Sequence, residues 1–154
     1  MQARLHIRTL NTIQDKHPYT HKLAYELCLG NHEFMERKLF ELCFVLYIRF
    51  QLEKMSPQII YQYFSLLRDI VQHNSTLGEN TKIQEIIDLG LTLEQFSDSA
   101  HENFTLTNTM LKINYHVTTW QNTHHICKFC GHSLDLLTQE LKALPKKKAQ
   151  SRQK

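Results

Sequence analysis

The length, composition and charge of this chain favour a small helical protein. Its 154 residues include only four glycines and three prolines, too few for the many tight turns of an all-β fold. No apolar run approaches the roughly 20 residues that span a bilayer, so we expect no membrane contact. The formal net charge is +3, and it is unevenly distributed along the chain.

The positive charge is concentrated at the C-terminus. The last thirteen residues carry six Lys or Arg and no acid, which leaves twelve basic residues against fifteen acids in the remainder. We therefore predict one helical domain over residues 1–144 and a basic disordered tail over residues 145–154. The tail contains Lys146, Lys147, Lys148 and Arg152.

These four residues resemble a nuclear-import signal or an arm that contacts phosphate groups. A tail that only keeps the protein in solution would have the same composition. We expect a nuclear or cytoplasmic protein, with the nucleus favoured, and weak nucleic-acid contact through the tail.

Apolar periodicity predicts helices throughout the first half of the chain. The expected ranges are 2–14, 19–29, 32–54 and 57–73. The third is apolar nearly all round, as a helix enclosed by others would be. Gly30 offers a C-cap or a kink after the second helix. Ser56 offers an N-cap to the fourth, and Pro57 suits its first position.

The second half predicts further helices. A short helix is expected over residues 81–89, ending at Gly90. Thr92 and Gln95 have the spacing of a capping box for a longer helix over 93–121, which could break at the β-favouring residues 105–109. Ser133 can cap a final helix with apolar positions Leu134, Leu137 and Leu141. The sequence therefore predicts an all-α protein, a compact bundle of about five to six helices.

Two cysteines separated by two residues form the clearest chemical motif. Cys127-Lys128-Phe129-Cys130 is followed by Gly131, and such a turn aims both sulfurs at one point. Zn²⁺ prefers thiolate and imidazole ligands in tetrahedral geometry. Because no secretory segment is evident, the four cysteines indicate metal binding or free thiols rather than disulfides. We predict a zinc knuckle just before the last helix.

A knuckle supplies two ligands, and a zinc site needs two more. Cys28 and His32 are four residues apart, so a helix continuing through Gly30 would place them on one face. With Cys127 and Cys130 they would form a Cys₃His site that closes a loop of roughly a hundred residues. Taken alone, Cys28 equally fits a buried small residue. The local alternative uses histidines beside the knuckle, namely His124, His125 or His132.

The helix expected over 93–121 carries two apolar stripes. The first comprises Leu106, Met110, Ile113, Val117 and Trp120. The second comprises Phe96, Phe104, Leu111 and Tyr115, and we expect it to face the core. One helix of a small domain rarely buries two wide apolar faces, so we expect the first stripe to be uncovered. It would then bind a protein partner, with Trp120 as the anchor.

No catalytic motif accompanies these features. The sequence has no glycine-rich phosphate loop, no Gly-x-Ser-x-Gly and no His-Glu-x-x-His. We predict a non-enzymatic, zinc-stabilised helical interaction module without a small-molecule substrate, acting as an adaptor or subunit of a larger nuclear assembly. One alternative is a nucleic-acid-binding protein that uses the knuckle, the last helix and the tail. A second alternative is a thiol–disulfide redox protein, although no β-strand is expected before the cysteine pair.

Overall fold

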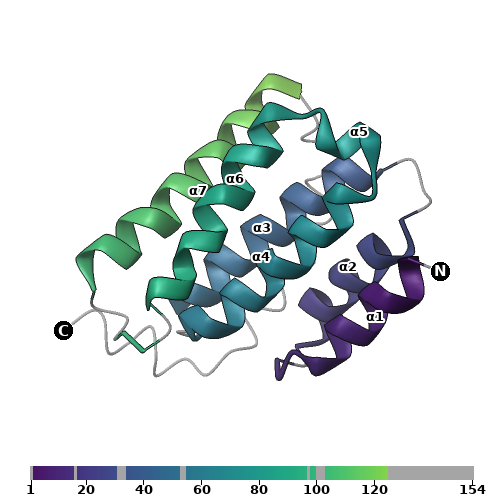
Figure 1. Cartoon of the computed structure of the whole chain (residues 1–154). Coiled ribbons are helices and arrows are strands. Elements are labelled where there is room, and N and C mark those ends of the chain that lie inside the picture. Colours follow the sequence, from purple (N-terminus) through teal and green to yellow (C-terminus); the bar gives the residue numbers. More distant parts are fainter. Residues whose placement is uncertain are drawn as a thin grey trace. The chain divides into compact units, whose positions relative to one another are not determined.

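Helices form every element in the part of the chain that the computed structural model describes, which is residues 2–15, 17–30, 34–52, 55–96, 98–99 and 103–124 (Figure 1). They are α1 (Gln2–Thr12), α2 (Pro18–Leu29), α3 (Met35–Leu52), α4 (Pro57–Gln72), α5 (Ser75–Gly78), α6 (Thr81–Leu91), the 3₁₀ helix η1 (Thr92–Phe96) and α7 (Phe104–His124). The predicted all-α fold is confirmed for this part of the chain. The predicted knuckle and the final helix after Ser133 lie outside the described residues.

Side-chain caps explain where several helices begin. Ser56 Oγ accepts a hydrogen bond from the Gln58 amide at 3.0 Å, as expected for the N-cap of α4. Asn74 Oδ1 accepts from the Leu77 amide at the start of α5. Asn80 Oδ1 accepts from two amides at the start of α6. The short α5 is a single capped turn, which raises the helix count above the one expected.

The prediction of one helix over 93–121 is wrong. Residues 92–96 form the separate helix η1, and α7 begins only at Phe104. Thr92 does not act as an N-cap, because its hydroxyl donates backward to the carbonyl of Leu89 at 2.6 Å. Asn103 takes the capping role for α7, since its Oδ1 accepts from the Leu106 amide at 3.1 Å.

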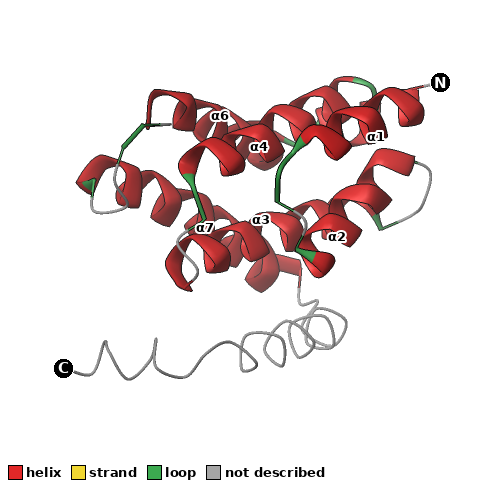
Figure 2. Cartoon of the chain, turned by 90° about the horizontal axis from the view of Figure 1, so that it is seen from below, coloured by secondary structure: helices red, strands yellow, loops and turns green. Residues whose placement is uncertain are grey.

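The chain divides into two compact units, Met1–Thr119 and Trp120–Lys154. Within the first unit the helices form two layers, with α1, α4 and α6 in one, and with α2, α3 and residues 104–119 of α7 in the other (Figure 2). In the first layer α4 packs against both α1 and α6. In the second layer α2 packs against α3, and α2 also contacts α1 across the layers.

The core of the first unit lies around α3. Five of its apolar side chains are fully buried: Leu39, Phe40, Leu42, Cys43 and Leu46. The expectation that this segment forms the enclosed helix is therefore confirmed. Opposite it, α4 contributes an apolar stripe that includes Ile60, Phe64 and Leu67, all fully buried. Each such side chain stabilises the fold by about 1.5–3 kcal/mol relative to an exposed one.

Candidate functional site

Only one of the four predicted zinc ligands lies among the described residues. Cys28 occupies the last turn of α2, where it is 2% exposed, and burial raises the pKa of its thiol to about 12. The helix does not continue through Gly30, which was the condition for placing Cys28 and His32 on one face, and Gly30 is instead the C-cap that the sequence offered. The helix ends at Leu29, and Gly30 adopts the left-handed conformation of a C-cap with φ of 66°.

The other predicted zinc ligands and the basic tail residues are not among the residues that the structure describes. His32, Cys127 and Cys130 lie outside the described residues, as do His125, His132 and the tail residues Lys146, Lys147, Lys148 and Arg152. The side chain of His124 is likewise not described. Among the described residues, no three His, Cys, Asp or Glu side chains are close enough to hold a metal ion. The zinc site remains a prediction from the sequence.

Cys28 lines a small cavity together with two histidines from other helices. The cavity has a volume of about 100 Å³, and His6 of α1 and His73 at the end of α4 both contribute to it. The two imidazole ring centroids are 5.6 Å apart. Burial lowers the pKa of His6, and the nearby His73 lowers it further, while the Asp69 carboxylate opposes both effects. The net effect of these surroundings is to favour the neutral form of His6.

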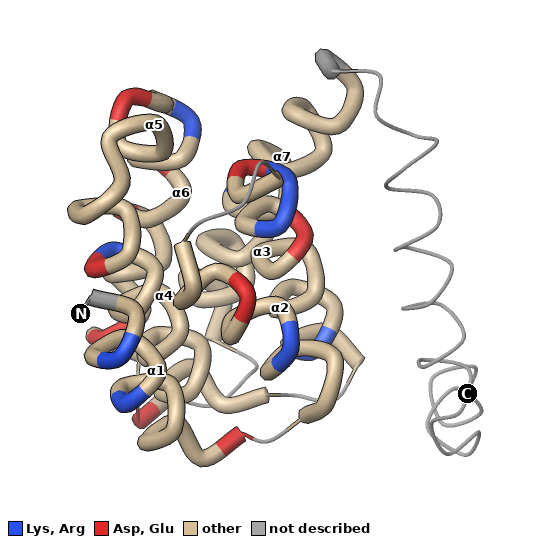
Figure 3. Tube along the Cα trace, turned by 90° about the vertical axis from the view of Figure 1, so that its right-hand side faces the viewer, with Lys and Arg blue, Asp and Glu red and all other residues tan. Residues whose placement is uncertain are grey.

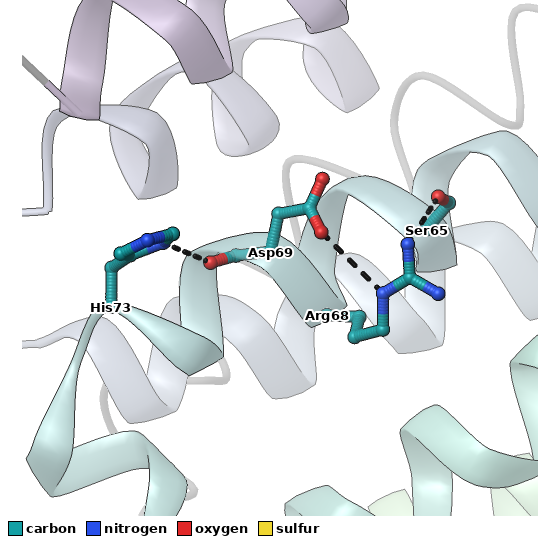
Figure 4. A network of polar contacts seen from close by, with 4 residues as sticks. All are labelled: Ser65, Arg68, Asp69 and His73. Carbon is teal, nitrogen blue, oxygen red and sulfur yellow. Dashed lines mark hydrogen bonds and ion pairs between the residues drawn. The ribbon is translucent and has the colours of Figure 1, made fainter.

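A polar network leads away from this cavity along α4 (Figure 4). His73 Nδ1 donates to the backbone carbonyl of Asp69 at 2.8 Å, which fixes the proton on that nitrogen because a carbonyl can only accept. Arg68 Nε donates to Asp69 Oδ1, and Arg68 Nη2 donates to Ser65 Oγ, each at 3.4 Å. Within this network no nucleophile is hydrogen-bonded to a base.

A larger cavity of about 340 Å³ lies on the Arg68 side of the same network. Polar side chains dominate its lining, which includes Arg68, Gln72, Ser75, Glu79 and Gln84. Two of these groups already have protein partners: Arg68 binds Asp69, and Gln84 donates to the carbonyl of Gly78. Most of the residues that line this cavity are polar, whereas ligand sites usually have mainly apolar lining residues and a few convergent polar groups.

A buried polar network joins the α1–α2 connection to the core. Arg49 of α3 is 0% exposed, and its Nη2 donates to His17 Nδ1 at 2.6 Å while its Nε approaches Thr20 Oγ1 at 3.4 Å. Tyr63 of α4 donates to the carbonyl and carboxylate of Asp15, at 3.2 Å each. Burial and the Asp15 carboxylate raise the pKa of Tyr63 well above its ordinary value. Spacing in the sequence gives no signal for this network, because its members come from three separate segments.

The two apolar stripes of α7 face opposite to the expected directions. Leu106, Met110, Ile113 and Val117 are fully buried, and Trp120 is 3% exposed. The expectation that this stripe is uncovered is therefore wrong. Phe104, Leu111 and Tyr115, which we expected to face the core, are 78%, 45% and 68% exposed. Phe96, the fourth residue of that stripe, is buried as expected, but it lies in η1.

The polar residues between the apolar ones explain this reversal. The buried stripe has an apolar side chain at every position. The other face places Asn108 and Thr118 among its apolar residues, and burying these two without partners would cost desolvation free energy. We call the five residues of this second face the α7 outer face: Phe104, Asn108, Leu111, Tyr115 and Thr118. Because Phe104, Leu111 and Tyr115 lie on one side of the helix, they form an exposed apolar surface.

The outer face has the spacing of a coiled-coil seam. Its successive members are separated by four, three, four and three residues, the alternation that keeps side chains facing a partner helix.

Lys112 is the only Asp, Glu, Lys or Arg among the 21 residues of α7. Figure 3 colours the charged residues along the described trace. His116 of α7 lies beside Glu85 of α6, with His116 Nδ1 3.8 Å from Glu85 Oε1.

Comparisons with protein-family models, curated proteins and solved structures found no match to this chain. None of the helices that the structure describes is both long and apolar enough to cross a membrane.

Proposed function

We propose that this protein is a non-enzymatic helical interaction module that binds a protein partner through the α7 outer face. The observation that carries the proposal is the exposure of Phe104, Leu111 and Tyr115 on one side of a single helix. Large apolar surfaces exposed on a small protein usually mark binding sites, and aromatic residues often dominate their binding free energy. The partner-binding role thus moves from the stripe expected from the sequence to the opposite face of the same helix.

The spacing of the outer face favours a helix as the element that the partner presents. Side chains at alternating four- and three-residue intervals insert between the side chains of a helix lying nearly parallel to α7. The sparse charge of α7 means that apolar packing, rather than ion pairs, would supply most of the affinity. Such a module fits an adaptor or small subunit of a larger assembly, and the basic tail residues favour a nuclear one.

The experiment uses two variants of the protein as baits, each of which lacks one exposed tyrosine. Tyr115→Ser removes a central side chain of the outer face, and Tyr25→Ser removes an exposed tyrosine of α2 as the matched control. Proteins that co-purify with each bait are identified by mass spectrometry, and the strongest candidate is then purified and titrated. We expect Tyr115→Ser to weaken its binding about 30-fold, as loss of a binding hot spot would. Tyr25→Ser should leave it unchanged. Equal binding by both variants would exclude the outer face as the binding surface.

A further inference from the structure

We propose that the partner of the α7 outer face is a second copy of this chain, with the two α7 helices packed side by side and parallel. This inference rests on the proposed function and names the partner. A two-fold dimer uses the same patch on both copies, so the patch must be complementary to itself. The spacing, the polar residues and the charges of the outer face all meet this requirement.

The seam positions pair well with their own counterparts. In a parallel pair each residue of the outer face meets the same residue of the second copy, so Phe104, Leu111 and Tyr115 form apolar layers. Asn108 meets Asn108, and a carboxamide is both donor and acceptor, so the two can hydrogen-bond to each other. A single asparagine at such a position fixes register in parallel pairs.

The charge of α7 permits self-pairing and favours the parallel direction. Partner choice between helices is usually set by charges flanking the seam, and α7 has only Lys112 there. In a parallel pair Lys112 lies beside Thr107 of the second copy, which carries no charge. An antiparallel pair centred on Leu111 would instead bring the two Lys112 side chains together and place Asn108 against Tyr115. Both changes disfavour that direction.

No other described helix offers a comparable covering surface. The remaining exposed large apolar side chains are Leu5, Tyr25, Leu29 and Phe34. Leu5 belongs to α1, Tyr25 and Leu29 belong to α2, and Phe34 lies in the turn just before α3, so only Tyr25 and Leu29 share the spacing of one helix face. Within the described part of the chain, the surface best suited to cover the α7 outer face is the same face of another copy.

The molar mass of the full-length protein in solution tests this proposal, because a dimer has twice the mass of a monomer. Analytical ultracentrifugation over a range of concentrations should show a monomer–dimer equilibrium for the wild type. Leu111→Asp should raise the dimer dissociation constant at least ~100-fold, because two carboxylates would meet in an apolar layer. Leu5→Asp is the matched control, since Leu5 is exposed on α1, and it should leave the equilibrium unchanged. A monomeric wild type, or equal dimerisation of the two variants, would overturn the proposal.

A photocrosslink distinguishes the direction of the helices. A p-benzoylphenylalanine incorporated at position 104 should attach to the second copy near residue 104 in the parallel pair. Attachment near residue 118 would overturn the parallel arrangement. The proposed function can hold even if this inference is wrong. If the wild type is monomeric but Tyr115→Ser loses a different protein partner, only the inference that the partner is a second copy is overturned. If neither dimerisation nor partner binding depends on the outer face, both proposals fall.

Discussion

The ring of Phe64 in α4 lies directly against the backbone of Gly90 in α6. A Cβ atom built on Gly90 would overlap Cγ and both Cδ atoms of that ring. Both residues are buried, so the Phe64 ring cannot swing into solvent to make room. The helix α6 continues through Gly90 to Leu91, although the sequence predicted that it would end at Gly90. The glycine permits close packing of two helices instead of ending one of them.

The contact predicts a strong effect of one added methyl group. Gly90→Ala should lower the free energy of unfolding by about 2–3 kcal/mol, because overpacking displaces the ring or the helix. Gly78→Ala is the control: its Cβ would lie 3.5 Å from the carbonyl oxygen of Val71, an ordinary contact. We expect that variant to change the stability by less than about 1 kcal/mol. Urea denaturation of both measures the difference, and equal effects would contradict the close packing of α4 on α6.

The buried Arg49 network predicts a second large effect. Arg49→Met should destabilise the protein by about 3 kcal/mol, because His17 Nδ1 and Thr20 Oγ1 would lose a hydrogen-bond partner in the interior. Arg68→Met, on a side chain that is 43% exposed, should cost less than about 1 kcal/mol. Thermal unfolding of the two variants gives the comparison. A loss below 1 kcal/mol for Arg49→Met would mean that the network contributes little to stability.

The histidine pair predicts a loss of stability in acid. Because the folded state lowers the pKa of His6, the unfolded chain binds a proton at higher pH than the folded one does. The contribution of His6 is therefore complete above the unfolded value near pH 6.5 and is lost as the pH falls through the folded value. His6→Phe should make the melting temperature less sensitive to a change from pH 7.5 to pH 5.

The helices could largely be predicted from the sequence, but several of their packing relationships could not. Periodic apolar residues and the cap Ser56-Pro57 located α1 to α4 to within a few residues. Asn103, rather than Thr92, caps α7, because a local capping pattern does not show which residue lies outside the preceding helix. Gly90 was misinterpreted for a related reason, since its role depends on Phe64, which is 26 residues earlier in the sequence.

The assignment of the two faces of α7 failed for a reason that the sequence contains. Both stripes have the period of a helix, but only the outer face has polar residues among its apolar ones, at Asn108 and Thr118. Weighing those two residues would have placed Leu106 and Met110 in the core and Leu111 on the surface. The proximity of His6, Cys28 and His73 could not be anticipated, because it depends on how α1, α2 and α4 pack together.

The zinc site is the last prediction, and cysteine variants can test it. We expect the protein as isolated to contain one Zn²⁺, and Cys127→Ser or Cys130→Ser to remove it. Cys43→Ala is the control, because Cys43 is fully buried in α3 and is not a predicted ligand. It should retain the metal despite a lower stability. Metal content is measured by mass spectrometry of the purified proteins, and a metal-free wild type would exclude the site.

Cys28→Ala then decides between the two proposed ligand sets. Loss of zinc in this variant would show that Cys28 is a ligand, and the end of α2 would have to rearrange to expose a thiol that is now 2% exposed. Retention of zinc would favour His124, His125 or His132 beside the knuckle. Structural zinc contributes on the order of 10 kcal/mol in small peptides, and a domain with its own core should lose less when a chelator removes the metal. Because α3 and α4 form such a core, we expect a chelator to lower the melting temperature of the wild type without abolishing its helical circular-dichroism signal.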